Sequence, residues 1–141
     1  MTVENIPIMG RGEEASLEQV CAIPLPKETS TYTPVPNNYA YDSILTSLLA
    51  QNWTLSRQGF KLTQNGSRVL SKMEFKREDQ VALIAWANSY NKSLSFIFGS
   101  GLGLEVCTNG MFDGADVFYN RRHQGGKNLF KEIEAKIQEA V

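Results

Sequence analysis

Residues 53–76 read WTLSRQGFKLTQNGSRVLSKMEFK, a stretch in which two runs of alternating polarity flank the sequence QNGS. The central Asn65-Gly66 pair favours the positive φ angles that a type I′ turn requires. Short runs with this alternation are typical of β-strands, and a tight turn between two of them joins them into a hairpin. The stretch therefore predicts two antiparallel strands, at residues 53–63 and 68–76.

The register of this hairpin separates apolar side chains from basic ones. A two-residue turn pairs Leu62 with Val69 and places Phe60 and Phe75 on the same face. We expect this apolar face to pack on a core, while the other face meets water. Glu74 is the one acid on the second face. The predicted binding residues on that face are all basic: Arg57, Lys61, Arg68, Lys72 and Lys76.

Helical periodicity flanks the strands on both sides. Apolar residues recur at three- and four-residue spacing up to Leu49, after the potential N-caps Asn37 and Asn38. A second amphipathic stripe covers residues 128–141. Further strands are favoured at residues 81–90, 93–98, 102–107 and 116–119. We expect an α+β fold, with an antiparallel, meander-like sheet of four to six strands and an N-terminal-side helix and a C-terminal helix packed on one face.

Residues 1–36 differ in composition from the rest of the chain. They contain all five prolines, and their acidic residues outnumber the basic ones. Because proline disfavours helix, we expect an extended acidic arm with a short helix around residues 14–20. A single α+β domain then covers residues 37–141. Two interpretations of the arm stay open: a mobile leader, or a cover on the basic face that a ligand displaces.

Bulk properties narrow the class of protein. The chain has 141 residues and a formal net charge of −1, which argues against a basic DNA-coating protein and an acidic DNA mimic. Neither a secretory signal nor an apolar stretch of membrane-spanning length is present. Cys107 is expected to be buried and not bonded to Cys21, as in a reducing bacterial cytoplasm. We expect no membrane partner, no metal and no cofactor.

Four short segments resemble motifs of a known family. Residues 88–93 (NSYNKS) resemble an Asn-Ser-His-Asp-Gly-Ser turn, and residues 104–110 (LEVCTNG) resemble a strand that ends in Val-Cys-x-Asn-Gly. Arg122-His123 resembles an Arg-His-Thr element before a helix, and residues 32–36 resemble a Tyr-x-Pro entry to the first helix. Together, residues 30–141 resemble the widespread phage/plasmid-like protein family of unknown function. The resemblance implies a mobile-element setting and no assigned reaction.

The other candidate site residues precede the C-terminal helix. Arg121, Arg122 and Lys127 add positive charge, and the glycines before this helix leave backbone N–H groups free for an anion. His123 is the only histidine of the chain, and no complete catalytic set is recognisable around it. A binding protein is therefore favoured over an enzyme. Three residues belong to the resembling motifs without an assigned role: Asn88, Asn109 and Gly110.

Charge segregation motivates the functional prediction. The hairpin is basic in a chain of net charge −1. A surface without a binding role is expected to mix positive and negative charges evenly. We expect the basic face and the residues before the last helix to bind a polyanion, first of all single-stranded nucleic acid, in replication or recombination. One alternative is a protein that inhibits a host defence factor through a protein–protein surface. Another is that the basic face is only a solvated strand face and binds no ligand. An exposed hairpin edge would also allow homo-oligomers.

Overall fold

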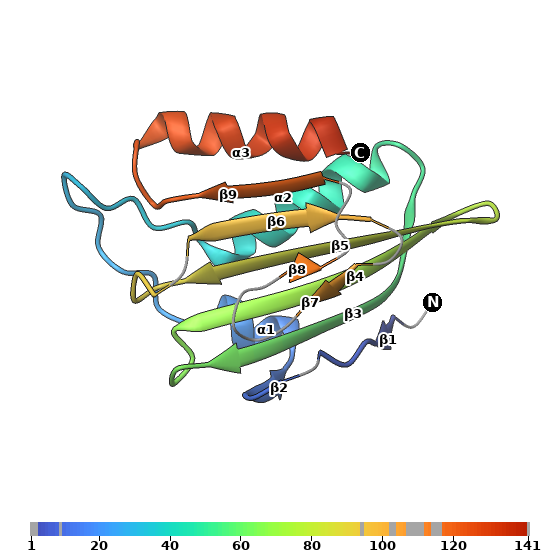
Figure 1. Ribbon diagram of the computed structural model, residues 1–141, viewed down its shortest axis with the longest axis horizontal. Coiled ribbons are helices and arrows are strands. Elements are labelled where there is room, and N and C mark those ends of the chain that lie inside the picture. The colour runs from blue at the N-terminus through green and yellow to red at the C-terminus, as the bar shows by residue number, and fades with distance from the viewer. Residues whose placement is uncertain are drawn as a thin grey trace.

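The computed structural model describes residues 3–8, 10–93, 95–101, 104–106, 112–113 and 117–140. Within these residues the chain forms three helices, a seven-stranded mixed sheet and a separate two-stranded pair (Figure 1). The α+β class predicted by the sequence is therefore confirmed.

The predicted hairpin is formed by β3 (Thr54–Thr63) and β4 (Arg68–Arg77). Leu62 pairs with Val69, which confirms the expected register. The register shifts once, at an irregularity just before Arg57. Because register decides which face each side chain occupies, the basic side chains of the hairpin lie on the face opposite Phe60 and Phe75, as predicted. That face also carries the buried Leu70, which lies opposite Lys61 in the register.

The loop between these two strands is longer than predicted. Gln64, Asn65 and Gly66 all have positive φ angles, of 52°, 57° and 86°. The Gly66 N–H donates to the Thr63 carbonyl and the Ser67 N–H donates to the Gln64 carbonyl, each at 3.1 Å. The connection is therefore a four-residue loop with three left-handed residues, not a two-residue type I′ turn. Asparagine and glycine adopt this conformation readily, whereas Gln64 adopts it at an energetic cost.

The hairpin continues into a meander. β5 (Gln80–Ser89) pairs antiparallel with β4, and β6 (Phe96–Ser100) pairs antiparallel with β5. The chain then forms the separate pair of β7 (Glu105–Val106) and β8 (Phe112–Asp113). It returns to the sheet as β9 (Val117–Arg121), which pairs with β6. Strands thus occur in each of the four regions where they are predicted after the hairpin.

The acidic arm is part of the sheet. β1 (Glu4–Asn5) pairs parallel with β3, and β2 (Glu13–Ala15) pairs antiparallel with it. These two short strands raise the sheet above the predicted four to six strands and make it mixed. α1 (Leu17–Cys21) follows, close to the predicted short helix. The β3 edge, on which the expected self-association rested, is therefore covered by the chain's own arm (Figure 1).

The helices bury their apolar stripes in one large hydrophobic cluster. α2 (Asn37–Leu49) contributes Ile44, and α3 (Lys127–Ala140) contributes Ile133, both fully buried. They pack with alternate side chains of the central strands, among them Trp86. In Figure 1, α1 and α2 lie behind the sheet and α3 runs beside β9.

A smaller cluster occupies the opposite face of the sheet. Ile8 of the arm and Leu104 join Leu70, Ala85 and Ile97 of the strands in this cluster, and all five are buried. The sequence predicts a basic, solvated face here. Only the β3–β4 part of it is rich in basic residues, because the inner strands β5 and β6 carry apolar residues on both faces.

Candidate functional site

Lys61, at the centre of the predicted basic face, binds the arm. Only 9 % of the residue is exposed, and its Nζ donates hydrogen bonds to the carbonyls of Ile8 at 2.6 Å and Gly10 at 2.8 Å. Glu14 of β2 lies opposite Lys61 in the strand register. Lys61 therefore anchors the acidic arm to β3, and its ammonium group is already occupied.

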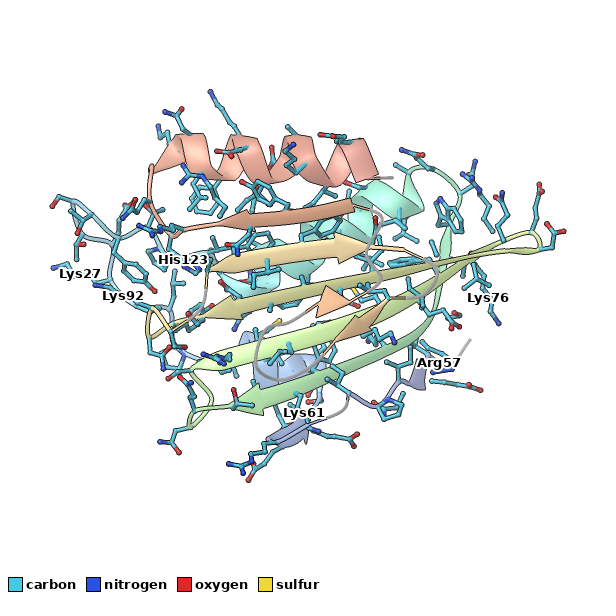
Figure 2. All side chains as sticks on the ribbon, in the orientation of Figure 1. Lys27, Arg57, Lys61, Lys76, Lys92 and His123 are labelled. Carbon is cyan, nitrogen blue, oxygen red and sulfur yellow. The ribbon has the colours of Figure 1, made fainter. Side chains whose placement is uncertain are left out.

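The other predicted binding residues of the hairpin are spread along two strands. Arg57 and Lys72 are half-buried, and Lys76 is exposed. The acid Glu74 lies opposite Arg57. Arg68 lies at the other end of β4, where its guanidinium donates to the turn that follows β5. In Figure 2, the labelled Arg57, Lys61 and Lys76 lie away from His123. These residues do not form one open basic surface.

Two predicted residues near the C-terminal helix lie apart from the hairpin. Arg121 forms an ion pair with Glu132 of α3, with 3.0 Å between Nε and Oε2. Lys127 is the first residue of α3 and is exposed. Three residues singled out by the sequence lie outside the described part of the chain: Cys107, Asn109 and Gly110.

Three of the motif-like segments meet at one end of the sheet. The turn after β5 contributes Tyr90 and Lys92, and the loop before α3 contributes Arg122 and His123. The arm contributes Tyr32, whose ring lies against the His123 ring with 5.9 Å between centroids. These segments are distant in the sequence, so their meeting is a product of the fold.

A buried network of amide groups holds this end together. The Asn88 Nδ2 donates to the Val35 carbonyl at 2.6 Å and to Asn37 Oδ1 at 2.9 Å. The Asn88 Oδ1 lies 2.7 Å from His123 Nε2. Because a carbonyl oxygen only accepts, Nε2 carries the proton of the neutral imidazole. The network is completed by the Asn37 N–H, which donates to Tyr90 Oη at 2.8 Å.

Asn37 has a different role from the predicted N-cap. The cap position of α2 is Pro36, which has no side-chain hydrogen bond to offer. Asn37 begins the helix, and its Nδ2 donates to the Val20 carbonyl at 3.4 Å while its Oδ1 accepts from Asn88. Because buried polar groups need partners, this amide links α1, α2 and β5 in one arrangement.

His123 is neutral at physiological pH. It is 6 % exposed, and burial lowers its pKa from 6.5 to about 4, because a buried imidazolium loses its hydration. With Nε2 bonded to Asn88, the lone pair of Nδ1 is available to accept a hydrogen bond. Among the described residues, no partner for Nδ1 is found. His123 thus offers an acceptor beside the turn that carries Lys92.

A pocket of about 320 Å³ opens beside this network. Lys92 and Arg122 bring two positive charges to its lining, and none of the described lining residues is acidic. Lys92 Nζ lies 4.8 Å from the centroid of the Tyr32 ring. Figure 2 shows Lys92 and His123 at the same end of the molecule. The lining residues come from all three segments: Thr31, Tyr32, Lys92, Ser95, Arg122, His123 and Gln124.

Tyr32 lines this pocket, and its hydroxyl group is buried. The residue is 6 % exposed, and its Oη has no hydrogen-bond partner in the described part of the protein. Burial is the main reason that the pKa of Tyr32 is raised, so the hydroxyl keeps its proton and remains a donor. An unpaired buried hydroxyl costs about 1–3 kcal/mol. A ligand that reached this hydroxyl and accepted its hydrogen bond would recover this cost.

The sequence identified part of this pocket. Asn88, Arg122 and His123 were among the residues singled out, whereas Tyr32 and Lys92 were not assigned to a site. Both lie in segments that resemble family motifs, and this resemblance was the sequence feature that could have assigned them to a site. Nothing in the linear sequence shows that residues 32, 92 and 122 meet, because their contacts depend on the paths of three separate loops.

The fold and this pocket define an α+β protein with a mixed sheet and a cationic pocket at one end. Comparisons with protein-family models, with curated proteins and with solved structures found no match to the chain. No helix in the described ranges is long and apolar enough to cross a membrane. The same ranges contain no group of three His, Cys, Asp or Glu side chains that could hold a metal ion.

Proposed function

We propose that this protein is a non-enzymatic accessory protein that binds single-stranded nucleic acid through the pocket beside His123. The carrying observation is that Lys92 and Arg122 line one pocket without an acidic residue among the described lining. Tyr32 also lines this pocket, and its buried hydroxyl has no partner in the described part of the protein. Cationic and hydroxyl donors form strong hydrogen bonds with phosphate oxygens. Phosphate contacts also supply most of the affinity that does not depend on nucleic-acid sequence.

Further basic residues lie at the same end of the molecule. Figure 2 shows Lys27 at the same end of the molecule as Lys92, and Lys27 is exposed. Arg68 donates to Ser93, the residue after Lys92, so the first basic residue of β4 also belongs to this end. A strand that leaves the pocket would meet additional positive charge here. This arrangement supports a polyanion as the ligand.

The cellular setting is proposed from the motif residues. The resemblance of residues 30–141 to the phage/plasmid-like family supports a role in replication or recombination of a mobile element. The site of action would be the cytoplasm of a bacterial host cell.

The lining of the pocket favours a binding role over Cys-His catalysis. A catalytic histidine is oriented by a third group and serves a nucleophile. Asn88 orients the His123 ring through its bond to Nε2, but no cysteine lies among the described residues that line the pocket. The alternative is an inhibitor that docks on a host protein through an apolar surface. In the described part of the chain, the exposed large apolar residues are Val3, Leu25, Leu49 and Val81.

Fluorescence anisotropy with a labelled single-stranded oligonucleotide, measured at several salt concentrations, tests the proposal. Binding should weaken steeply as salt rises, because each neutralised phosphate releases counterions. The double variant Lys92→Gln, Arg122→Gln should bind about tenfold more weakly or worse, since it loses two charge-assisted contacts.

The control removes the same amount of charge from the hairpin face. Lys72 and Lys76 are not among the described residues that line the pocket, so Lys72→Gln, Lys76→Gln should leave the affinity nearly unchanged. Equal losses in the two double variants would show that the pocket is not the site. Absence of binding by the wild-type protein at low salt would contradict nucleic-acid binding altogether.

A further inference from the structure

We infer that the pocket holds the phosphorylated end of a nucleic-acid strand, that is, a terminal nucleotide with a phosphate monoester. This inference rests on the proposed function and adds which part of the polymer enters the pocket. It follows from the pocket's size, its cationic donors and the neutral acceptor that His123 adds.

The size of the pocket suits one nucleotide and not a run of them. Ligand pockets span roughly 300–1,000 Å³, and this pocket, at about 320 Å³, lies at the lower limit. Its walls come from three segments, represented by Tyr32, Lys92 and Arg122. A nucleotide inside a strand needs two exits for the chain, whereas a terminal nucleotide needs only one. A small pocket with walls from three segments therefore favours a strand end.

The donors in the lining suit a phosphate monoester. A monoester carries about 1.5–2 negative charges near neutral pH and presents three strong acceptor oxygens. An internal phosphodiester carries one charge. Lys92 and Arg122 supply two positive charges to the lining. Tyr32, which also lines the pocket, has a buried hydroxyl donor without a partner within the described residues, and we infer that the ligand reaches it. Two cations and one further donor match the charge and the oxygens of the terminal group.

His123 adds an acceptor that a phosphate group would not use. An ionised phosphate accepts hydrogen bonds, so the lone pair of His123 Nδ1 needs a donor elsewhere in the ligand. The sugar hydroxyls and base N–H groups of a nucleotide are such donors. Lys92 and His123 both contact the Tyr32 ring, so the donors and the acceptor belong to one site. The combination points to a phosphate attached to a nucleoside.

Three oligonucleotides of one sequence test this inference. They carry a 5′-phosphate, a 3′-phosphate or hydroxyls at both ends, with the fluorophore on an internal base. One phosphorylated form should bind about tenfold tighter than the form with two hydroxyl ends, from the added charge-assisted contacts. Adenosine 5′-monophosphate should compete with it more strongly than inorganic phosphate does, because only the nucleotide offers sugar hydroxyls and base N–H groups that can reach His123 while the phosphate contacts the cations.

Tyr32→Phe is the most informative variant, because it removes only the Oη atom. That hydroxyl has no partner in the described part of the free protein, so the melting temperature should stay the same or rise. The preference for the phosphorylated end should fall several-fold. Lys27→Gln is the matched control, since Lys27 is an exposed cation at the same end that does not line the pocket. The preference should survive in this control.

The outcomes separate this inference from the proposed function. Equal affinity for all three oligonucleotides overturns the inference and leaves nucleic-acid binding in place. Binding of adenosine 5′-monophosphate without binding of any oligonucleotide overturns the proposed function and supports a nucleotide pocket. Equal competition by inorganic phosphate overturns the part assigned to His123. A lower melting temperature for Tyr32→Phe overturns the assignment of its hydroxyl to the ligand.

Discussion

Asn88 uses all the hydrogen-bonding groups of its amide inside the core. Its Nδ2 donates to Val35 and Asn37, and its Oδ1 is bonded to His123. Lys92 and Arg122 are the charged residues that line the adjoining pocket, and both are cations. A proton added to His123 would therefore create a buried charge beside like charges and without a carboxylate among the described pocket lining.

We expect the protein to lose stability in mild acid because of His123. Its pKa is about 4 in the folded protein, below the ordinary value of 6.5. Between these values the unfolded chain binds a proton that the folded protein does not, so the free energy of unfolding rises with pH in this window. Above pH 6.5, His123 does not lower the free energy of unfolding. As the pH approaches 4, it lowers the free energy of unfolding by up to about 3 kcal/mol. Urea denaturation at a series of pH values measures it.

The variant His123→Gln provides the comparison for this prediction. It keeps a polar side chain beside Asn88 but cannot titrate in this range. Its free energy of unfolding should vary much less than that of the wild-type protein between pH 4 and 6.5. The same pH dependence in both proteins would show that other groups cause the acid sensitivity.

Among the elements, β3 is the strand that holds the arm. Glycine is required at position 59, because a Cβ there would overlap the carbonyl oxygen of Ile6. The Ile6 N–H donates to the Gln58 carbonyl at 3.1 Å, so the arm backbone lies directly against the strand. Close approach of two backbones is a common reason for glycine inside a strand.

Gly59→Ala should therefore release the arm from β3. The clash is with backbone and cannot be relieved by a side-chain rotation, so we expect a destabilisation of about 1–3 kcal/mol. Hydrogen exchange should rise selectively in the arm around Ile6.

Gly66→Ala is a useful comparison, because position 66 has open space around its Cβ but a φ angle of 86°. Gly66→Ala should strain the backbone of the loop but leave the arm protected from hydrogen exchange. Equal protection of the arm in both variants would contradict the role of Gly59.

At the scale of the whole molecule, the arm closes one edge of the sheet. Lys61 anchors it through two backbone carbonyls, and Ile8 fills the cluster on the second face. Lys61→Glu would place a carboxylate against these carbonyl oxygens, so it would destabilise the fold as well as change the surface charge. A loss of binding in this variant would therefore not show that Lys61 contacts the ligand.

Deletion of residues 1–15 should convert β3 into an exposed edge strand. Unpaired backbone groups on a ten-residue strand are a template for pairing with another chain. We expect the truncated protein to associate as its concentration rises, and the full chain to associate less under the same conditions. Sedimentation velocity at several concentrations measures the difference. Identical sedimentation of the two proteins would show that the arm does not protect the sheet.

The features predictable from sequence were those encoded by neighbouring residues. Asn65-Gly66 and the alternation around it predicted the hairpin register, and the stripe of Ile133 and its neighbours predicted the last helix. The arm was predicted to be extended, but its composition does not indicate the strand with which it pairs. The pocket was only partly predicted, because Tyr32 and Lys92 meet through loops whose paths depend on the assembled sheet.

The pairing of the arm with β3 also sets an order of events during synthesis. The arm is made before its partner strand, since Glu4 pairs with Arg57, roughly fifty residues later in the chain. At about 5–20 residues per second, the arm waits several seconds for that strand. Its prolines and acidic side chains suit this interval, since such a segment stays hydrated and resists premature pairing. β1 and β2 thus join the sheet only after β3 has been synthesised.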